Sequence, residues 1–376
     1  MATICIVLPC LFFVSVVYAV EPLFTRVPEH GLQPQALIGS DGATHLVFFS
    51  GNPKSGNLSY AKRAAGRAEF ATSLQINSQP GDAIAIGTIR GAQIALGKEN
   101  RLHVAWNGSG QAGHHPGSPL WYTRLKEAGT GFEPERDVMT FSGGLDGGAS
   151  VAADKRGNVF VVWHGQPRMQ GTEADRCVFM ALSTNEGRSF IPERKIDPEA
   201  NGACACCGLK AFVSANGDVY ILYRQAIKGV ERGEVLLVSS DTGRTFRRVF
   251  SHPWSATTCP MSSAWLAESG PAHLIAAWET AARVWFQVGL ANSPPIPVSD
   301  RPKTGQKFPV TASNRTGQTL IAWVEGAGWE KVGVLAWKTI SGAGEPAGIE
   351  QRGGDIPVWS FAAAVALPDG NFEVFF

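Results

Sequence analysis

The sequence of 376 residues lacks an excess of either charge, since 33 lysines and arginines stand against 32 aspartates and glutamates. It also lacks any block of basic residues that would attract a phosphate backbone. Charged residues make up only 17% of the chain, whereas hydrophobic residues make up 44%, which is enough for a large core. The composition therefore excludes a disordered chain, and we expect no nucleic-acid partner.

Long hydrophobic runs are also scarce, because residues 4–20 form the only one. This run ends at Ala19 ahead of polar residues, which is typical of a secretory signal peptide covering residues 1–19. The segment before the run has no lysine or arginine, and an uncleaved membrane anchor is the alternative. We expect a secreted or periplasmic protein, a monomer with no membrane span after cleavage, whose remaining domain covers residues 20–376.

Cysteine is scarce in the expected mature chain. Cys5 and Cys10 leave with the signal peptide. The cysteines that stay are Cys177, Cys204, Cys206, Cys207 and Cys259. In an oxidising compartment this odd number leaves at least one thiol without a disulfide partner.

Glycine and the large aromatic residues, in contrast, are abundant, with 43 Gly, 11 Trp and 20 Phe. This composition is typical of a β-rich chain with many turns. One hairpin pattern recurs every ~45–60 residues: two strands around a turn rich in Asp, Asn and Gly, the second strand ending in an aromatic residue. Its seven copies are residues 35–49, 93–106, 150–163, 211–223, 264–278, 310–323 and 363–376.

This spacing leaves room for two more strands after each hairpin, which is the arrangement of a β-propeller. We therefore predict an all-β fold, a single β-propeller with six or seven four-stranded blades, seven being preferred. Nothing follows Phe376 to complete the last blade, so we expect residues 23–27 to supply its outer strand and close the ring. A six-bladed ring would require one hairpin to be spurious.

Two turns in adjacent repeats share the pattern Ser-x-Asp/Asn-x-Gly-x-Ser/Thr-Phe, known as the Asp-box. In such a turn the acidic or amide side chain caps backbone N–H groups, the glycine takes a positive φ, and the aromatic ring packs between strands. We expect a structural role for both turns, between third and fourth strands on the face away from the functional site. Their residues are Ser183, Asn185, Gly187 and Phe190, and Ser239, Asp241, Gly243 and Phe246.

The repeat and the two turns make the chain resemble the sialidase (neuraminidase) superfamily of β-propellers, also called BNR or Asp-box proteins. The resemblance covers nearly all of the mature chain. Residues 202–208, 259–262, 278–280 and 358–360 are similar to a bacterial group of secreted sialidase-like proteins. This resemblance implies a fold and a compartment but no particular reaction.

Sialidase chemistry needs three arginines to bind the sugar carboxylate, a tyrosine nucleophile activated by glutamate, and an aspartic acid. Catalytic families also carry a Phe/Tyr-Arg-Ile-Pro segment ahead of the first blade. The nearest string here, residues 24–28, has one extra residue and valine in place of isoleucine. Tyr223 is the tyrosine that we place at the rim, and we do not expect a true exo-sialidase.

Polar residues follow the second strands of five repeats. Because these strands end at the same mouth of the channel, we predict a polar ring there, with solvated turn residues as the alternative. The ring would consist of Asn107, His164, Arg224, Glu279 and Glu325. In an enzyme, which would be a sialidase-like glycoside hydrolase, Glu279 and Glu325 are the candidate general acid and base.

Arg224 and Glu279 should pair across neighbouring blades, either in a ligand site or as a plain salt bridge. An ion pair at an open rim stabilises a protein by about 0–1 kcal/mol, so alanine at Arg224 should remove ligand binding and leave stability nearly unchanged.

The connectors between blades reach the same rim. They carry Arg90, Trp359 and both cysteine segments, while Trp329 follows the second strand of the sixth repeat. The two tryptophans offer flat faces for a sugar ring.

Because the two cysteine segments precede adjacent hairpins, we expect Cys204, Cys206 and Cys207 to contact Cys259. Three chemistries stay open: disulfides, a soft Cu(I) or zinc site of thiolates with Met261, or free thiols. No other cofactor is expected.

The leading interpretation is a propeller that binds, or in catalytic form also hydrolyses, a glycan or other small polar ligand at the rim. The ligand-binding candidates are Arg224, His164, Asn107, Tyr223, Arg90, Trp329 and Trp359. The alternatives are a non-catalytic protein-interaction scaffold and a metal or redox protein built on the cysteines.

Overall fold

The computed structural model describes residues 21–110, 118–167, 172–197, 202–268, 274–289, 293–300 and 304–376. The expected signal peptide, residues 1–19, lies outside the described residues, and so does the turn of the fifth hairpin at residues 269–271. Over the described ranges, no helix is both long and apolar enough to cross a membrane. The helical elements there are short 3-10 turns: η1 (Pro28–His30), η2 (Lys98–Asn100) and η3 (Glu173–Asp175).

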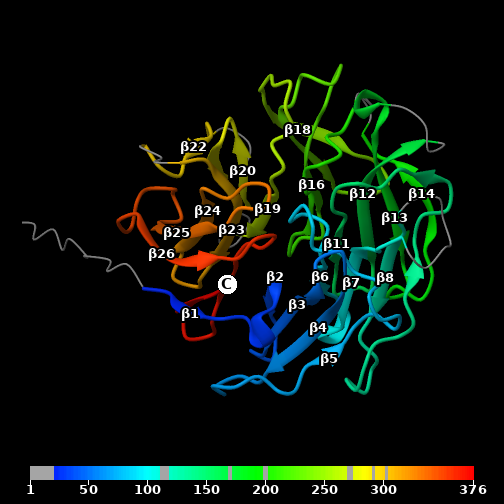
Figure 1. The fold of residues 1–376 in the computed structure, drawn as a ribbon, viewed down its shortest axis with the longest axis horizontal. Helices are drawn as coiled ribbons and strands as arrows, with labels where there is room; N and C mark the ends of the chain where they lie inside the picture. The colour runs from blue at the N-terminus through cyan, green and yellow to red at the C-terminus, as the bar shows by residue number, and fades with distance from the viewer. Residues whose placement is uncertain are drawn as a thin grey trace, which may run out of the picture.

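The described strands form seven sheets that follow one another around a ring (Figure 1). Blades 1 to 3 contain β2 (Leu32–Ile38), β3 (Thr44–Asn52), β4 (Ser55–Arg63) and β5 (Leu74–Gln75); β6 (Gln93–Leu96), β7 (Leu102–Asn107), β8 (Leu120–Arg124) and β9 (Arg136–Asp137); and β11 (Ser150–Ala153), β12 (Val159–Pro167), β13 (Cys177–Ser183) and β14 (Ile191–Lys195). A short extra strand, β10 (Ser142–Gly143), pairs with the end of β12.

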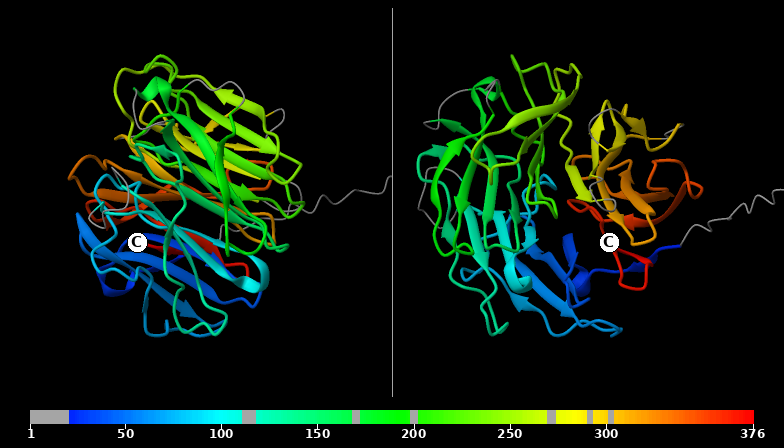
Figure 2. Two further views of the ribbon diagram at one scale, coloured as in Figure 1. Left: turned by 90° about the vertical axis from the view of Figure 1, so that its right-hand side faces the viewer. Right: turned by 180° about the vertical axis from the view of Figure 1, so that it is seen from behind.

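The next three sheets repeat this order, and Figure 2 shows the same succession from behind. Blades 4 to 6 contain β15 (Lys210–Val213), β16 (Val219–Arg224), β17 (Glu234–Ser239) and β18 (Arg247–His252); β19 (Ala264–Glu268), β20 (Leu274–Thr280), β21 (Arg283–Val288) and β22 (Ile296–Pro297); and β23 (Gln306–Ser313), β24 (Thr319–Glu325), β25 (Gly333–Ile340) and β26 (Gln351–Ile356).

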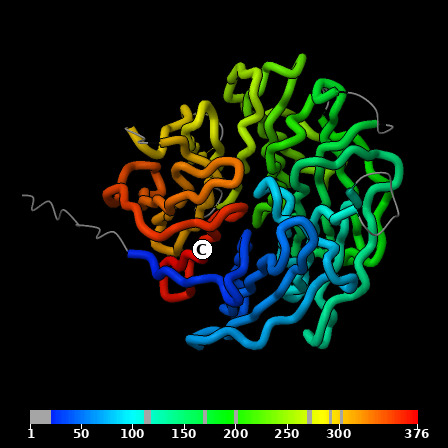
Figure 3. The backbone as a smooth tube through the Cα atoms, viewed as in Figure 1, coloured from blue at the N-terminus to red at the C-terminus, as the bar shows by residue number. Residues whose placement is uncertain are grey.

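The seventh blade is built from both ends of the chain. β27 (Ala363–Ala366) and β28 (Phe372–Phe375) form its hairpin, and β1 (Leu23–Thr25) pairs with β28 in parallel. The blue N-terminal strand accordingly lies beside the red C-terminal hairpin in Figures 1 and 3. The prediction of a seven-bladed propeller closed by the N-terminal strand is confirmed, and the six-bladed alternative is wrong because all seven hairpins form separate sheets.

The aromatic residues that end the second strands are core residues between neighbouring blades. Trp106 packs in one cluster with Phe49 and Tyr60 of blade 1, and Trp163 in another that also contains Tyr122 of blade 2. Trp323 belongs to the cluster of blades 5 to 7. Large rings at these positions fill the gaps between adjacent blades, which explains why the repeat places an aromatic residue there.

The two turns with the Asp-box pattern have the expected geometry. Ser183 Oγ donates to Asn185 Oδ1 and accepts from the backbone N–H of Gly187, both at 2.8 Å. Gly187 has φ 76°, and Phe190 packs edge-on against Tyr122. The second turn has the matching bonds among Ser239, Asp241 and Gly243, with Phe246 against the neighbouring core. Both turns follow third strands, so they lie at the end of the blade opposite to the connectors that precede first strands.

Blades 1 and 2 each contain a buried histidine whose ring contacts a tyrosine hydroxyl. His45 Nδ1 lies 2.9 Å from the Tyr60 hydroxyl, and His103 Nδ1 lies 2.7 Å from that of Tyr122. Burial lowers the pKa of His45 to about 4 and that of His103 to about 3. Both imidazoles are therefore neutral in the folded protein over most of the acidic range.

Acidification from pH 6.5 to 4.5 should consequently destabilise the fold. The unfolded chain binds protons on these imidazoles from pH 6.5 downward and the folded chain does not, so stability falls by up to about 1.4 kcal/mol per pH unit for each group. Urea denaturation at a series of pH values measures the slope. His103→Gln should flatten it, whereas the same change at exposed His30 should not; equal slopes in both variants would contradict the role of the buried pair.

Candidate functional site

The five residues predicted to form a polar ring lie at the ends of second strands, but they are buried. Their exposed fractions are 1% for Asn107, His164 and Glu279, 3% for Arg224 and 5% for Glu325. The connectors between blades cover these side chains. In one connector, for example, the backbone N–H of Cys204 donates to the carbonyl of Arg224 at 2.9 Å. The expectation of an open polar ring is therefore corrected, because these side chains form a layer beneath the mouth.

Arg224 lies between two buried carboxylates. Its Nη2 is 3.3 Å from Glu234 Oε2 in the next strand and 3.6 Å from Glu279 Oε2 in blade 5. Its guanidinium also donates to the backbone carbonyls of Arg232, at 2.8 Å, and of Glu279. Burial raises the pKa of Glu234 to about 8 although the charge of Arg224 opposes this. Burial also raises the pKa of Glu279, and the three side chains form a buried triad that joins blades 4 and 5.

The two carboxylates considered as acid and base have separate partners. Glu325 Oε2 accepts a 2.6 Å hydrogen bond from Arg352 Nε of β26, and its other oxygen accepts one from the Trp323 indole at 3.2 Å. The contacts of Glu279 run instead to Arg224 and to the backbone N–H of residue 282. Each carboxylate is thus bonded to protein groups of its own surroundings.

Tyr223 and Arg90 are also engaged within the protein. The Tyr223 hydroxyl donates to Asp197, whose Oδ2 is 3.0 Å from Arg248 Nη2. Arg90 donates to the Asp146 carbonyl at 2.7 Å and pairs with its carboxylate. These contacts hold the two residues to neighbouring segments of the framework.

Asn107 and His164 lie against the connector that enters blade 3. Asn107 Nδ2 donates to the Gly147 carbonyl at 3.1 Å. Burial lowers the pKa of His164 to about 4. A Cβ at Gly147 would lie 2.0 Å from the Ala205 carbonyl and 2.9 Å from the His164 ring, so only glycine permits this approach of the connector to the cysteine turn.

The four cysteines of the rim segments meet, as their positions in the repeat indicate. Cys206 and Cys259 form a disulfide that links the connectors entering blades 4 and 5. Cys204 Sγ lies 3.4 Å from Cys207 Sγ and 3.8 Å from Cys259 Sγ. Cys177 is a buried free thiol in β13.

One group of side chains has the composition of a soft metal site. The ligand atoms of Glu173, Cys204, Cys206 and Cys259 lie within 4.8 Å of one another. Since Cys206 and Cys259 are joined as a disulfide, Cys204 is the one cysteine of this set that can offer a thiolate to Cu(I) or zinc before the disulfide is reduced. No motif in the sequence pointed to Glu173, which comes from η3. Met261, the other predicted ligand, lines the pocket described next.

An aromatic pocket opens on the rim between blades 5, 6 and 7. Trp329 is 57% exposed, and its ring meets that of Trp359 edge-on, with centroids 4.6 Å apart. Met261, Lys307 and Phe308 line the same pocket, which encloses about 20 Å³. The Lys307 ammonium donates to the Pro260 carbonyl at 2.7 Å. The structure thus brings together both predicted tryptophans and Met261.

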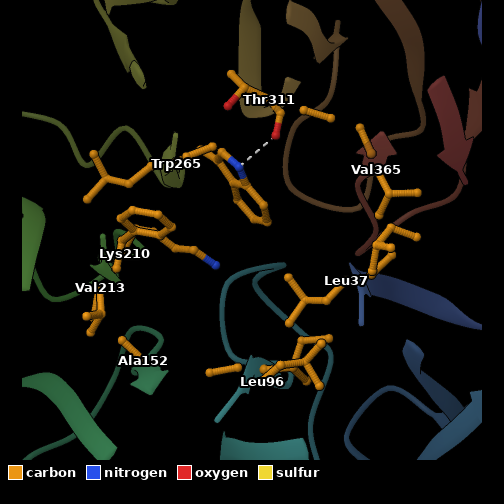
Figure 4. Close-up of a pocket in the computed structure, with 18 of the residues that line it drawn as sticks. Leu37, Leu96, Ala152, Lys210, Val213, Trp265, Thr311 and Val365 are labelled. Carbon is orange, nitrogen blue, oxygen red and sulfur yellow. Dashed lines mark hydrogen bonds between the residues drawn. The ribbon is translucent and has the colours of Figure 1, made fainter. Parts of the chain in front are cut away.

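The central channel contains a buried lysine that the sequence analysis missed. First strands line a cavity of about 360 Å³, with apolar residues such as Leu37, Leu96 and Val365 on its walls (Figure 4). Lys210 Nζ lies 3.9 Å from the ring centroid of Trp265, and burial lowers its pKa to about 8. The signal was a charged residue directly before the fourth hairpin, because the residue before each of the other hairpins is small or apolar: Pro34, Ala92, Ala149, Ser263, Pro309 and Ala362.

Comparison with protein-family models gives no match, and comparison with curated proteins gives none either. Solved structures share the fold at low identity. A protein of unknown function from Dyadobacter fermentans is 13% identical with a TM-score of 0.53, over 91% of this chain and 99% of that one.

Two sialidases are similar in the same way. NanB sialidase from Streptococcus pneumoniae is 10% identical with a TM-score of 0.55, over 91% of this chain and 82% of its own. The Hadza microbial sialidase Hz136 is 13% identical with a TM-score of 0.51, over 84% and 69%. Identities this low show the fold alone, and the chain therefore has the fold of a sialidase-like β-propeller.

Proposed function

We propose that this chain is a secreted sialidase-like propeller that binds a carbohydrate at the channel mouth without cleaving it. The exposure of Trp329 is the observation that carries the proposal. All eleven tryptophans lie within the described residues, and Trp329 is the only one of them that is exposed. Trp359 fixes the Trp329 ring at an interplanar angle of 79°. A fixed, exposed indole face offers a large apolar platform at little entropic cost, which suits the apolar face of a sugar ring. The expected signal at residues 1–19 supports the compartment.

A positive charge lies beside this platform. Lys307 is half-buried at the pocket, and burial lowers its pKa while the charge of Glu279 opposes the change. Because the pocket encloses only about 20 Å³, a sugar would lie across it and not within it. An acidic sugar, whose carboxylate meets Lys307 while its ring covers Trp329, fits this arrangement best.

Unusual backbone geometry supports a functional role for the same rim. Trp359, Phe308, Met261 and Thr88, which all line the pocket, have φ between 49° and 69°. Non-glycine residues in the left-handed region cost free energy and collect at ligand sites, where the surrounding structure maintains them.

Binding fits the structure better than hydrolysis. The groups that a sialidase-type reaction would use, Arg224, Glu279, Glu325 and Tyr223, are buried and bonded to other protein groups. A substrate would have to break these contacts before reaching any of them.

The test is a glycan array with neutral, sialylated and uronate-containing glycans, followed by titration calorimetry. Trp329→Ala should weaken binding of the best glycan at least tenfold, because the stacking surface is lost, whereas Trp329→Phe should retain part of it. Lys307→Met should weaken binding of acidic glycans more than that of neutral ones.

Phe141→Ala provides the matched control, since Phe141 is an aromatic residue of similar exposure, 55%, and does not line the pocket. It should bind as the unaltered protein does. Failure of every glycan to bind, or equal affinity of Trp329→Ala and the unaltered protein, would overturn the proposal. Turnover of a glycoside panel would show a hydrolase instead.

A further inference from the structure

Four sulfur atoms surround one point on the rim. Cys204 Sγ is in contact with all the others, at 3.4 Å from Cys207, 3.6 Å from Cys206 and 3.8 Å from Cys259. Two of these partners, Cys206 and Cys259, are already joined as a disulfide. A free thiol therefore lies beside a disulfide and beside a second free thiol, and Cys204 and Cys207 have the Cys-x-x-Cys spacing of many dithiol pairs.

A charged side chain contacts one of the two free thiols. Arg232 Nη1 donates to Cys204 Sγ at 3.0 Å, and its other nitrogen pairs with Glu173 at 2.5 Å. Cys204 in turn donates a hydrogen bond to Cys207 Sγ at 3.4 Å, so the two free thiols are neighbours in the buried part of the cluster.

The two pairs differ in access to solvent. Cys204 is fully buried and Cys207 is 2% exposed, whereas Cys206 and Cys259 are partly exposed. An external thiol or disulfide can reach only the second pair directly. Reducing equivalents stored on Cys204 and Cys207 must pass through Cys206 and Cys259.

We infer that the four cysteines form a thiol–disulfide redox centre that passes an electron pair between the buried Cys204/Cys207 pair and external disulfide compounds. Cys204 gives up its proton and attacks one sulfur of the Cys206–Cys259 disulfide, which forms a new S–S bond and releases the other sulfur as a thiolate that takes up a proton. Cys207 then attacks Cys204, which forms Cys204–Cys207 and releases the second thiolate. The two thiol protons move to Cys206 and Cys259, so no external oxidant is needed for this isomerisation.

The outer pair then carries the activity. As thiols, Cys206 and Cys259 reduce an external disulfide, which leaves as two thiols while the Cys206–Cys259 bond forms again. The substrate class is therefore a disulfide of low molecular weight or one exposed on a protein. This activity goes beyond carbohydrate binding, although Cys259 lies in the same connector as Met261 of the aromatic pocket.

Redox titration of the full chain in dithiothreitol buffers, with differential alkylation and peptide mapping, tests this centre. We expect two redox couples, one for the Cys206–Cys259 disulfide and one for the Cys204–Cys207 disulfide. Cys177 should be alkylated as a thiol in every buffer. The form with only the Cys206–Cys259 bond, isolated at low pH and transferred to pH 8 without external thiol, should acquire Cys204–Cys207 bonds. Glutathione disulfide serves as the external probe.

Cys207→Ser should lose one couple and the isomerisation, and Cys204→Ser serves as a second variant if the first does not fold. Cys177→Ser is the matched control, a buried thiol outside the cluster, and should behave as the unaltered protein does. The inference would be overturned if Cys204 and Cys207 stay thiols in every buffer that oxidises Cys206 and Cys259 to their disulfide. Stoichiometric copper or zinc on the four thiolates of the purified protein would overturn it as well.

Discussion

Alanine at Arg224 should destabilise the folded protein by about 3–5 kcal/mol, because removing one partner leaves buried carboxylates uncompensated. Arg224 is 3% exposed, and its guanidinium is the counter-charge of Glu279 and the neighbour of Glu234. Its hydrogen bonds to two backbone carbonyls would be lost at the same time. Urea denaturation at pH 7, followed by tryptophan fluorescence, measures the loss.

Two further variants separate charge from packing. Glu234→Gln should cost little at pH 7, since burial raises the pKa of Glu234 to about 8 and glutamine keeps a neutral side chain of equal size. Arg224→Met combined with Glu279→Gln should recover part of the stability, because no charge is then buried alone. If the urea midpoint of Arg224→Ala equals that of the unaltered protein, the buried triad does not stabilise the fold. Arg224 would then behave as a residue of an open rim.

This expectation reverses the one drawn from the sequence, where an open ion pair was predicted to contribute about 0–1 kcal/mol. The position of Arg224 at the end of a second strand was correct. Its burial was not predictable, because it depends on the connector that begins near Cys204 and covers the strand end. The path of that connector is set by tertiary contacts, including a disulfide to residue 259, and not by any local pattern.

The ring itself was predictable because its signals are local. Strand length, turn residues and a terminal aromatic residue recur within each hairpin, and each of these features acts over a few residues. The use of residues 23–27 to close the ring followed from the unfinished last blade. The parallel sense of the β1–β28 pairing was not part of that prediction.

The cysteine cluster was also predictable only in part, because some of its members follow the repeat and others are brought in by tertiary contacts. Counting repeats placed both cysteine segments on one rim, and the structure brings their sulfurs within contact. Arg232 and Glu173, which contact this cluster, belong to a loop and a 3-10 turn outside the repeat pattern. No spacing in the sequence links them to Cys204.

A buried carboxylate in blade 3, that of Glu193, should contribute strongly to the stability of the fold. Glu193 is 2% exposed in the otherwise exposed strand β14. Its oxygens accept hydrogen bonds from the backbone N–H groups of Thr140, Phe141 and Ser142, and from the hydroxyls of Thr140 and Ser142. These bonds outweigh burial and lower its pKa. Glu193 thus fastens the segment that leaves blade 2 onto blade 3.

Glu193→Ala should therefore destabilise the protein by at least about 3 kcal/mol, since several buried donors lose a charged acceptor at once. Denaturation midpoints measure this loss, and Glu193→Gln should fall between the alanine variant and the unaltered protein. Glu127→Ala, which removes an exposed carboxylate paired with Arg101, is the matched control and should leave the midpoint unchanged. Because the fastened segment continues to Asp146, which binds Arg90, the loss should also increase hydrogen exchange at residues 140–149. Unchanged exchange there, together with an unchanged midpoint, would show that the segment is held by its packing and not by the carboxylate.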